Sequence, residues 1–304
     1  MLIINDGSTD NSAKVLAWYQ KKYDFIEVLN DEWSGLSHVR NKMLDIVDTK
    51  YIAFSDSDDI LSQDMYKDLY KYCERYDADV AICKTIEKDN FNHYNIVLSV
   101  PVNEVLVYDY ERMAYEKYNR TKYNIFFVST VNKIMKTEVA KKVRFTDNNR
   151  YEDTGYTPSV YTYINKFVFV PYIMYIWDKR QRQTTGTYST SYNKLDKNTL
   201  YHYLYEGLSY AVYNGNKDNL DYVKYCAIQE LLAIYHDDGS LSIKSKDELK
   251  NKILDIINKT DIDNNKYIQG NEKVKFGISS ITSTFTPPKI NLLKDILKEL
   301  NKKE

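Results

Sequence analysis

The first ninety residues alternate short apolar runs with segments of helical periodicity. Runs such as Leu2 to Ile4 and Tyr51 to Phe54 are bounded by polar turn residues, and the segments between the runs repeat apolar residues every three to four positions. Strands that alternate with helices in this way are typical of a parallel sheet flanked by helices. We therefore expect an α/β fold, with further strands at Ile26 to Leu29 and about Val80 to Ile86.

Composition narrows the class of protein. The 304 residues carry 42 Lys and Arg against 43 Asp and Glu, and this balance argues against a nucleic-acid binder that neutralises phosphates with a basic excess. The three cysteines, Cys73, Cys83 and Cys226, form no Cys-x-x-Cys pair, which fits reduced thiols in the core of a cytoplasmic protein. The length suffices for one large domain or two.

Two groups of acidic residues follow predicted strands. Asp6 ends the first strand, and Asp56 to Asp59 follow the third. Open parallel sheets bind ligands outside the carboxyl ends of their strands, so we expect both groups to border one crevice. Taken alone, each group also fits a turn without a function. The Asp-x-Asp spacing of Asp56 and Asp58 offers two hard oxygen ligands to one divalent cation.

Six short segments share their order and spacing with one known family. The first three are Asn5-Asp6-Gly7-Ser8-Thr9-Asp10-Asn11-Ser12, Gly35-Leu36-Ser37 with Arg40-Asn41, and Tyr51-Ile52-Ala53-Phe54-Ser55-Asp56-Ser57-Asp58-Asp59. The later three are Val131-Asn132-Lys133-Ile134-Met135, Arg144-Phe145 and Glu152-Asp153-Thr154. Together they resemble the family 2 glycosyltransferases. The resemblance implies a GT-A fold, with a Rossmann-like, mostly parallel sheet flanked by helices, and a metal-dependent, inverting transferase.

The resemblance implies a role for each residue near the strand ends. Asp6 would contact the uracil of a UDP-sugar, and Arg40 would contact the nucleotide or its diphosphate. Asp56 and Asp58 would hold Mn²⁺ or Mg²⁺, with Asp58 as the direct ligand and Asp56 nearer the ribose. The cation would neutralise the charge that develops on the departing UDP.

Later residues complete the implied site. Asp153 matches the catalytic base of the family, which accepts the proton of an acceptor hydroxyl, and Glu152 would orient it. Arg180 and Arg182 lie where relatives carry a flexible loop that closes over the diphosphate, although Trp177-Asp178-Lys179 departs from the family pattern there. Either arginine could reach a phosphate, and a solvated basic turn is the alternative.

The resemblance also bears on the start of the chain. Relatives have a further strand and helix before the Asp-Gly-Ser motif, and that strand lies centrally in their sheet, whereas the printed chain opens at Met1 inside a strand. A start codon assigned too late, a gene fragment and a rearranged sheet are the three explanations. They leave an alternative function open, that of a non-catalytic or truncated homologue acting as a partner or scaffold subunit. A nucleoside-binding regulator is a third option.

The second part of the chain differs in character. From about Ser191 the pattern becomes one of Tyr-rich helices, so we expect a transferase core at residues 1–190 and a helical region at residues 191–304. The last segment after Pro288 is basic and amphipathic, and it would pack on the protein or contact an anionic membrane surface. The expected acceptor is a glycan, a lipid-linked sugar or a cell-wall polymer, at the cytoplasmic side of the membrane. An oligomer is compatible with the sequence.

Overall fold

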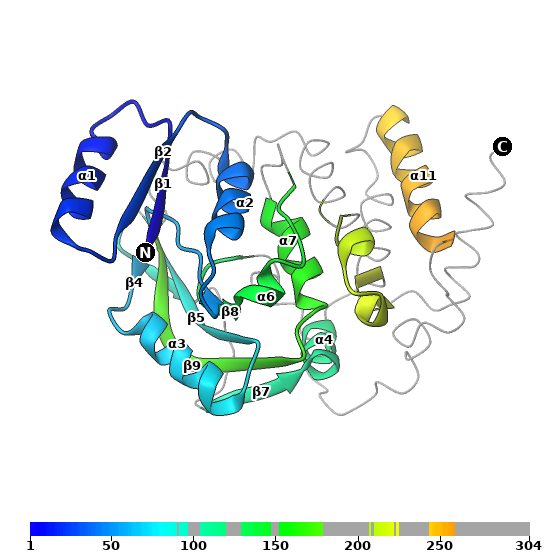
Figure 1. The fold of residues 1–304 in the computed structure, drawn as a ribbon. Coiled ribbons are helices and arrows are strands. Elements are labelled where there is room, and N and C mark those ends of the chain that lie inside the picture. Colours follow the sequence, from blue (N-terminus) through cyan, green and yellow to red (C-terminus); the bar gives the residue numbers. More distant parts are fainter. Residues whose placement is uncertain are drawn as a thin grey trace.

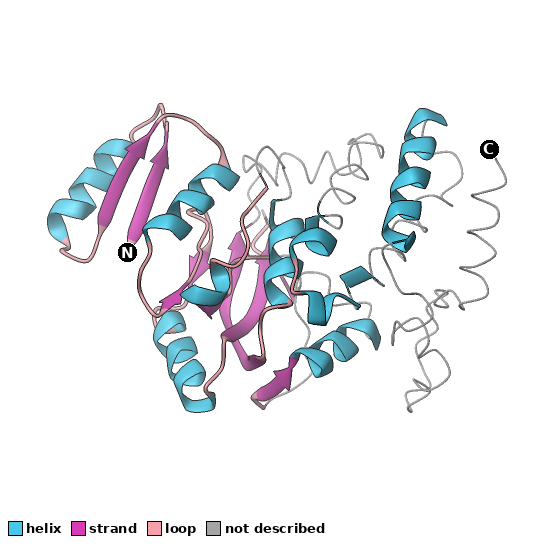
Figure 2. Cartoon of the chain, turned by 45° about the vertical axis from the view of Figure 1, so that its right-hand side comes forward, coloured by secondary structure: helices cyan, strands magenta, loops and turns pink. Residues whose placement is uncertain are grey.

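The computed structural model describes residues 1–89, 91–96, 104–119, 129–146, 152–178, 207, 210–221, 223–224 and 243–258 (Figure 1). Within these ranges the strands form a two-stranded sheet and a seven-stranded sheet. Helices lie on both sides of the larger sheet (Figure 2). The α/β class expected from the periodicity is confirmed.

The smaller sheet belongs to a β1–α1–β2 unit at the upper left of Figure 1. β1 (Leu2–Asp6) pairs in parallel with β2 (Glu27–Asp31), and α1 (Ser12–Lys22) connects them. α1, which is described in full, buries none of its residues. Among the described residues no strand of the larger sheet pairs with β1 or β2. The unit is therefore a separate layer rather than the edge of one continuous sheet.

The larger sheet has the strand order β3–β8–β5–β9–β4, with β6 paired to β5 and β7 paired to β9. Its strands are β3 (Tyr51–Ile52), β4 (Ile60–Leu61), β5 (Val80–Lys88), β6 (Tyr94–Ile96), β7 (Leu106–Asp109), β8 (Lys133–Lys136) and β9 (Lys166–Asp178). β5 and β9 run parallel, whereas the other described pairings of this sheet are antiparallel. The expectation of a mostly parallel sheet is wrong in this respect. Hydrophobic periodicity reports which residues are buried and carries no information on strand direction.

Strand β9 contains a proline in its interior. Proline usually interrupts a strand, but β9 is continuous over 13 residues through Pro171. Its pairing with β5 shifts register between Cys83 and Thr85, opposite Pro171 and Tyr172. Proline has no backbone N–H to donate, so a bulge lets the strand continue past it.

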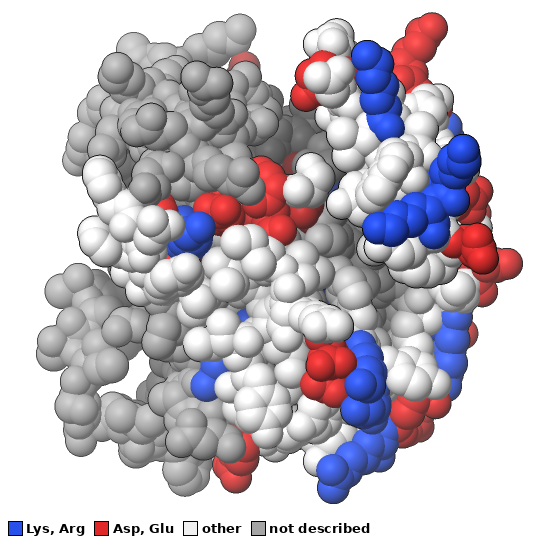
Figure 3. All heavy atoms as spheres, turned by 90° about the vertical axis from the view of Figure 1, so that its left-hand side faces the viewer, with Lys and Arg blue, Asp and Glu red and all other residues white. Residues whose placement is uncertain are grey.

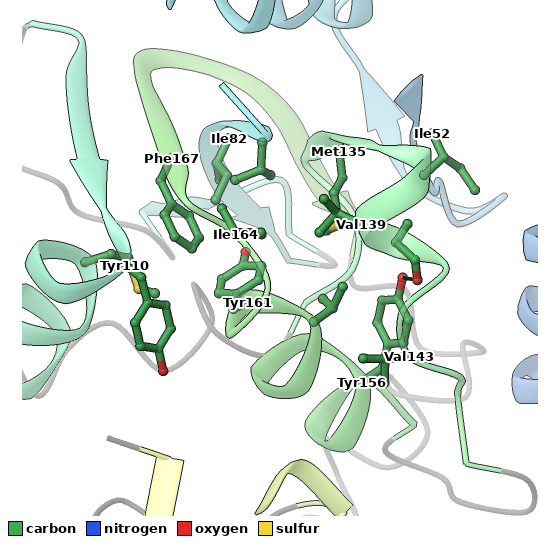
Figure 4. Packing of buried hydrophobic residues seen from close by; sticks show 14 of the residues in the cluster. Ile52, Ile82, Tyr110, Met135, Val139, Val143, Tyr156, Tyr161, Ile164 and Phe167 are labelled. Atoms are coloured by element: carbon green, nitrogen blue, oxygen red, sulfur yellow. Dashed lines mark hydrogen bonds between the residues drawn. The ribbon is translucent and has the colours of Figure 1, made fainter. Parts of the chain in front are cut away.

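The core lies on the two faces of the larger sheet. Val80 and Ile82 of β5 point to one face and Ala81 and Cys83 to the other, as the two-residue period of a strand requires. The first face is covered by α2 (Leu36–Ile46), α4 (Tyr110–Asn119), α6 (Thr137–Ala140) and α7 (Glu152–Tyr161). Figure 4 shows the aromatic and aliphatic side chains of this face, including Tyr161 and Phe167. The opposite face is covered by α3 (Met65–Tyr76).

Part of the C-terminal region packs against α7. Gly155 of α7 lies so close to Tyr210 that an added Cβ would be 3.2 Å from its ring, and the Tyr210 hydroxyl donates to the carbonyl of Arg144 at 2.6 Å. α11 (Ile243–Asn258) is the last described helix. The expected domain boundary near residue 191 and the basic terminal segment lie outside the described residues. Within those residues, no helix has both the length and the apolar character needed to cross a membrane.

Candidate active site

The first part of the site lies where β1 ends. One carboxylate oxygen of Asp6 accepts hydrogen bonds from the backbone N–H and hydroxyl of Ser34, at 2.7 and 2.8 Å, and the other accepts from the N–H of Gly35 at 2.9 Å. Burial alone would raise the pKa of Asp6, but these hydrogen bonds outweigh it and hold the pKa below its usual value. Asp6 thus fixes the loop that leads into α2.

Two glycines and an exposed tryptophan shape this loop. Gly7 has a φ of 68°, and a Cβ there would lie 2.7 Å from the backbone nitrogen of Trp33, so the close approach requires glycine. Gly35 has a φ of 93° and precedes the first residue of α2. The Trp33 side chain remains 81% exposed on this anchored loop. Trp33 was not predicted as a site residue, although its position between the Asp6 and Gly35 motifs indicated that it lies near them.

The second part is the loop from β3 to β4, which carries the Asp-x-Asp motif. The carboxylate of Asp59 accepts hydrogen bonds from the hydroxyl of Tyr175 and, at 3.1 Å, from the N–H of Asp178, so the end of the loop is fastened to β9. Burial, with the charges of Asp56 and Asp58 adding to it, raises the pKa of Asp59 to about 6. This anchoring leaves Asp56 and Asp58 on a loop that is fixed at both ends by strands.

Arg40 lies at the centre of the site. It belongs to the buried face of α2 and is 4% exposed. One guanidinium nitrogen donates to Asp56 at 2.8 Å and another donates to Glu152. The guanidinium carbon lies 5.5 Å from the ring centre of Phe145 and 6.0 Å from that of Phe54. Burial opposes the charge on Arg40, but the two carboxylates overcome this and raise its pKa above the usual value.

Glu152 and Asp153 begin α7. Two carboxylates in the first turn of a helix are stabilised by the positive end of its dipole. Burial and the neighbouring charge of Glu152 raise the pKa of Asp153 to about 7, while Arg40 and Lys133 oppose this shift. Burial also raises the pKa of Glu152, against the effect of Arg40. Asp153 is therefore a carboxylate whose protonation changes near neutral pH, as a general base requires.

Lys133 is a buried cation beside these acids. Asn132 adopts a positive φ of 62° and donates from its amide to the carbonyl of Cys83 and the hydroxyl of Thr85, which fixes the start of β8. The Lys133 ammonium donates to the carbonyl of Ser129. Burial lowers its pKa to about 7, and the charge of Asp153 opposes that shift. Lys133 belongs to one of the six motif segments but was not predicted as a site residue.

The residues present fit a divalent cation that is shared with a substrate. Among the described residues, no three His, Cys, Asp or Glu side chains form a ready cation cage. Mg²⁺ in nucleotide enzymes is usually held by one or two carboxylates together with substrate phosphates, and Asp56 and Asp58 supply that number. One oxygen of Asp56 is already engaged by Arg40.

The structure brings together most of the predicted site residues. Arg40, Asp56 and Glu152 are in contact, with Asp153 adjacent, whereas Asp6 contacts the Ser34–Gly35 loop instead. α2 joins the two groups, since Gly35 and Arg40 are five residues apart, about 7.5 Å along a helix. On the face drawn in Figure 3, acidic side chains gather near the centre and basic ones lie mostly toward one side. Arg180 and Arg182 lie outside the described residues.

Comparisons with known proteins agree with the motif order. The family model for glycosyl transferase family 2 matches residues 1–144. The chain is 27% identical over 187 residues to glycosyltransferase GlyG of Streptococcus pneumoniae serotype 4, covering 59% of this chain and 61% of GlyG. It is 33% identical over 180 residues to the teichoic acid poly(glycerol phosphate) polymerase of Staphylococcus epidermidis, covering 55% of this chain and 22% of the polymerase. The chain thus spans less than two thirds of the length of either relative.

Solved structures agree in fold. Residues 1–349 of S. aureus TarS in complex with UDP-GlcNAc superimpose with a TM-score of 0.64 at 18% identity, covering 86% of this chain and 72% of the other. The complex of the same protein with UDP gives a TM-score of 0.61 at 17% identity. Identities this low show the GT-A fold alone. Motif order, fold and family match agree, and residues 1–144 of the chain match glycosyl transferase family 2.

Proposed function

We propose that the chain transfers a sugar from a UDP-sugar to an acceptor hydroxyl, with inversion at the anomeric carbon and with a bound Mn²⁺ or Mg²⁺. The observation that carries the proposal is Asp153, a carboxylate with a pKa of about 7 that adjoins Glu152 and, through it, the Arg40–Asp56 pair. Nucleotide recognition alone gives no reason for a second pair of acids, Glu152 and Asp153, beside the Asp-x-Asp loop.

The proposed chemistry assigns one task to each group. Asp153 accepts the proton of the acceptor hydroxyl while that oxygen bonds to the anomeric carbon from the face opposite the leaving group. The bond from the anomeric carbon to the phosphate oxygen breaks, and its electron pair leaves with UDP. A general base in this position contributes typically about 10²- to 10⁴-fold in rate. A cation held by Asp58 and Asp56 supplies Lewis-acid stabilisation of the departing diphosphate.

The donor end of the proposal rests on the loops around β1 and β3. We assign Asp6 to the uracil. Its carboxylate has a lowered pKa and holds the Ser34–Gly35 loop, and both observations support this role. The exposed indole of Trp33 on the same loop supports stacking against the base, a contact worth about 1–3 kcal/mol. TarS, the fold neighbour, was solved with UDP-GlcNAc, so UDP-GlcNAc is the first donor to test.

The acceptor and the rest of the chain belong to the proposal as well. The relatives named for teichoic acid and other glycosyl transfer support a glycan, lipid-linked or cell-wall acceptor. We assign the chemistry to residues 1–190, with Arg180 or Arg182 near the diphosphate. We propose that residues 191–304 contribute to acceptor choice or assembly, and that their basic terminal segment packs on the protein or contacts the cytoplasmic membrane face.

The direct test is calorimetric titration of UDP in the presence and absence of Mn²⁺. We expect Mn²⁺ to strengthen UDP binding by the wild type and to have little effect on Asp58→Ala. The matched control is Asp64→Ala, an exposed acid at the start of α3 whose partner is Lys67, which should bind as the wild type does. Equal metal-dependent binding by the wild type and Asp58→Ala would exclude Asp58 as a ligand. A wild type that binds no UDP favours the alternative of a non-catalytic partner subunit.

A further inference from the structure

We propose that Arg40 is a positioning residue that fastens the Asp56 loop to the start of α7, and thereby holds Asp153 in place, instead of binding the diphosphate of the donor. The inference rests on the proposed function in one respect, because it takes Asp153 as the base. It replaces the role that the sequence pattern implied for Arg40.

The two ion pairs of Arg40 join three separate elements. Arg40 extends from α2, Asp56 follows β3, and Glu152 is the first residue of α7, 112 positions away in the sequence. The planar guanidinium presents its donors in a fixed fork, so contacts to two carboxylates set the spacing between them. Because Asp153 directly follows Glu152, the same contact limits the positions that the base can take.

Aromatic rings enclose this guanidinium. Phe145 and Phe54 face it, and their ring centres are 5.6 Å apart in an edge-to-face arrangement. Phe145 also stacks on Tyr156 of α7 at 3.8 Å. The Arg40 side chain is accordingly 5% exposed. A diphosphate would have to displace these rings to reach the guanidinium of Arg40. Two carboxylates already neutralise that guanidinium, so both observations argue against direct phosphate binding.

The charges around Asp153 determine which substitution of Arg40 can test its role. Arg40 and Lys133 are the cations that act on Asp153, against the negative charges of Glu152 and Asp56. Removing Arg40 alone leaves the buried Glu152 carboxylate unpaired, which destabilises a fold more than replacing a buried pair by apolar residues. The double variant Arg40→Met/Glu152→Met removes both members of the buried pair and fills their space. Arg40→Lys keeps the charge but not the fork.

The experiment compares binding with turnover. UDP and uridine are titrated by calorimetry without a divalent cation, so that the measured affinity does not depend on Asp56 as a cation ligand. UDP release is followed in the presence of Mn²⁺ with UDP-GlcNAc and other UDP-sugars. We expect Arg40→Met/Glu152→Met to fold, to bind UDP within about threefold of the wild type and to lose about 100-fold in kcat, the size expected when a reacting group is displaced by about 1 Å. Arg40→Lys should recover part of kcat with the KM for the donor unchanged.

The control is Lys42→Met, on the same helix as Arg40. It removes the ion pair between Lys42 and Asp31 of β2, at 2.5 Å, and should leave both binding and kcat unchanged. A tenfold loss of UDP affinity in Arg40→Lys or in the double variant, with uridine affinity kept, would make Arg40 a diphosphate ligand and overturn the inference. A double variant with wild-type kcat would also overturn it. A wild type that binds no UDP contradicts the proposed function instead, so the two failures are distinguishable.

Discussion

The β1–α1–β2 unit and the cluster around Arg40 are held in opposite ways. α1 buries none of its residues and exposes Val15 and Trp18 by half or more, whereas every residue of α7 after Asp153 is buried. The first unit is joined to the rest by the Asp6 carboxylate and by α2, while the second is fixed by ion pairs and packed rings. Under the proposed function, donor recognition and proton transfer therefore depend on two parts of the molecule that are held in place in different ways.

The two regions are expected to differ in local stability. Segments with few buried apolar contacts open at lower free energy than packed core elements. We therefore expect substitutions around Arg40 to change rate and global stability, and substitutions around Asp6 to change donor affinity.

The largest effect is expected for Asp153→Asn. An amide cannot accept the acceptor's proton, so turnover should fall by about 10²- to 10⁴-fold. UDP affinity should stay within about twofold, because Asp153 belongs to the packed cluster rather than to the Asp6 loop. UDP release measures the rate and calorimetry measures the affinity. Retained turnover, with an acceptor identified, would remove Asp153 as the base.

The second prediction compares matched valines of the two regions. Val160 of α7 is fully buried, whereas Val15 of α1 is 50% exposed. Removing two buried methyl groups and leaving a cavity costs about 2–3 kcal/mol, so Val160→Ala should lower the free energy of unfolding by that amount. Val15→Ala should change it by less than about 0.5 kcal/mol. Urea unfolding measures both, and equal losses would contradict the contrast between α7 and α1.

The sequence predicted the local helices and strands better than it predicted the pairings between distant segments. Strands β1, β2, β3 and β5 were predicted because apolar periodicity is a local signal, whereas the two-residue strand β4 was not. The separation of β1 and β2 from the larger sheet was not predicted, because strand order depends on pairings between distant segments. Serine is a favoured N-cap residue, but Ser37 lies inside α2, whose N-cap is Gly35.

The site shows the same limits. The motif order identified Asp56, Glu152 and Asp153 as neighbours, and the structure places them together around Arg40. The partners of Arg40 were not predicted, because an arginine in a motif gives no indication of whether it faces a ligand or a carboxylate. The burial of Lys133 was missed for the same reason. Its depth depends on β8 lying between β3 and β5, a tertiary arrangement without a local signal.

The third prediction concerns pH. Burial and Glu152 raise the pKa of Asp153 to about 7, so the base is protonated below that value. We expect kcat/KM to rise with pH up to a midpoint near 7 and to fall about tenfold per unit below it. Ionising Asp153 in the folded state is unfavourable, so this group's contribution to stability is lost as pH rises from its unfolded pKa, about 3.9, through about 7.

A variant sharpens this pH prediction. The positive charge of Lys133 opposes the rise in the pKa of Asp153. Lys133→Met should therefore move the midpoint of the kcat/KM profile to higher pH. The control is Lys71→Met, which removes an exposed partner of Asp68 at 3.1 Å on α3 and should leave the midpoint unchanged. A midpoint near 4 in the wild type would mean that the base is an ordinary exposed carboxylate.

The smallest effect is expected in the first region, for Asp6→Asn. The carboxylate of Asp6 receives three hydrogen bonds from Ser34 and Gly35 through both oxygens, whereas asparagine offers one acceptor oxygen and turns an NH₂ group toward the other donors. Losing about 1 kcal/mol of net hydrogen bonding should weaken UDP binding by about fivefold and leave kcat within twofold. Asp10→Asn, at an exposed acid that accepts from Ser12 at 2.9 Å, serves as the control. If Asp6→Asn lowers kcat as strongly as Asp153→Asn while UDP still binds, donor recognition and proton transfer share one support, and the division between the two regions fails.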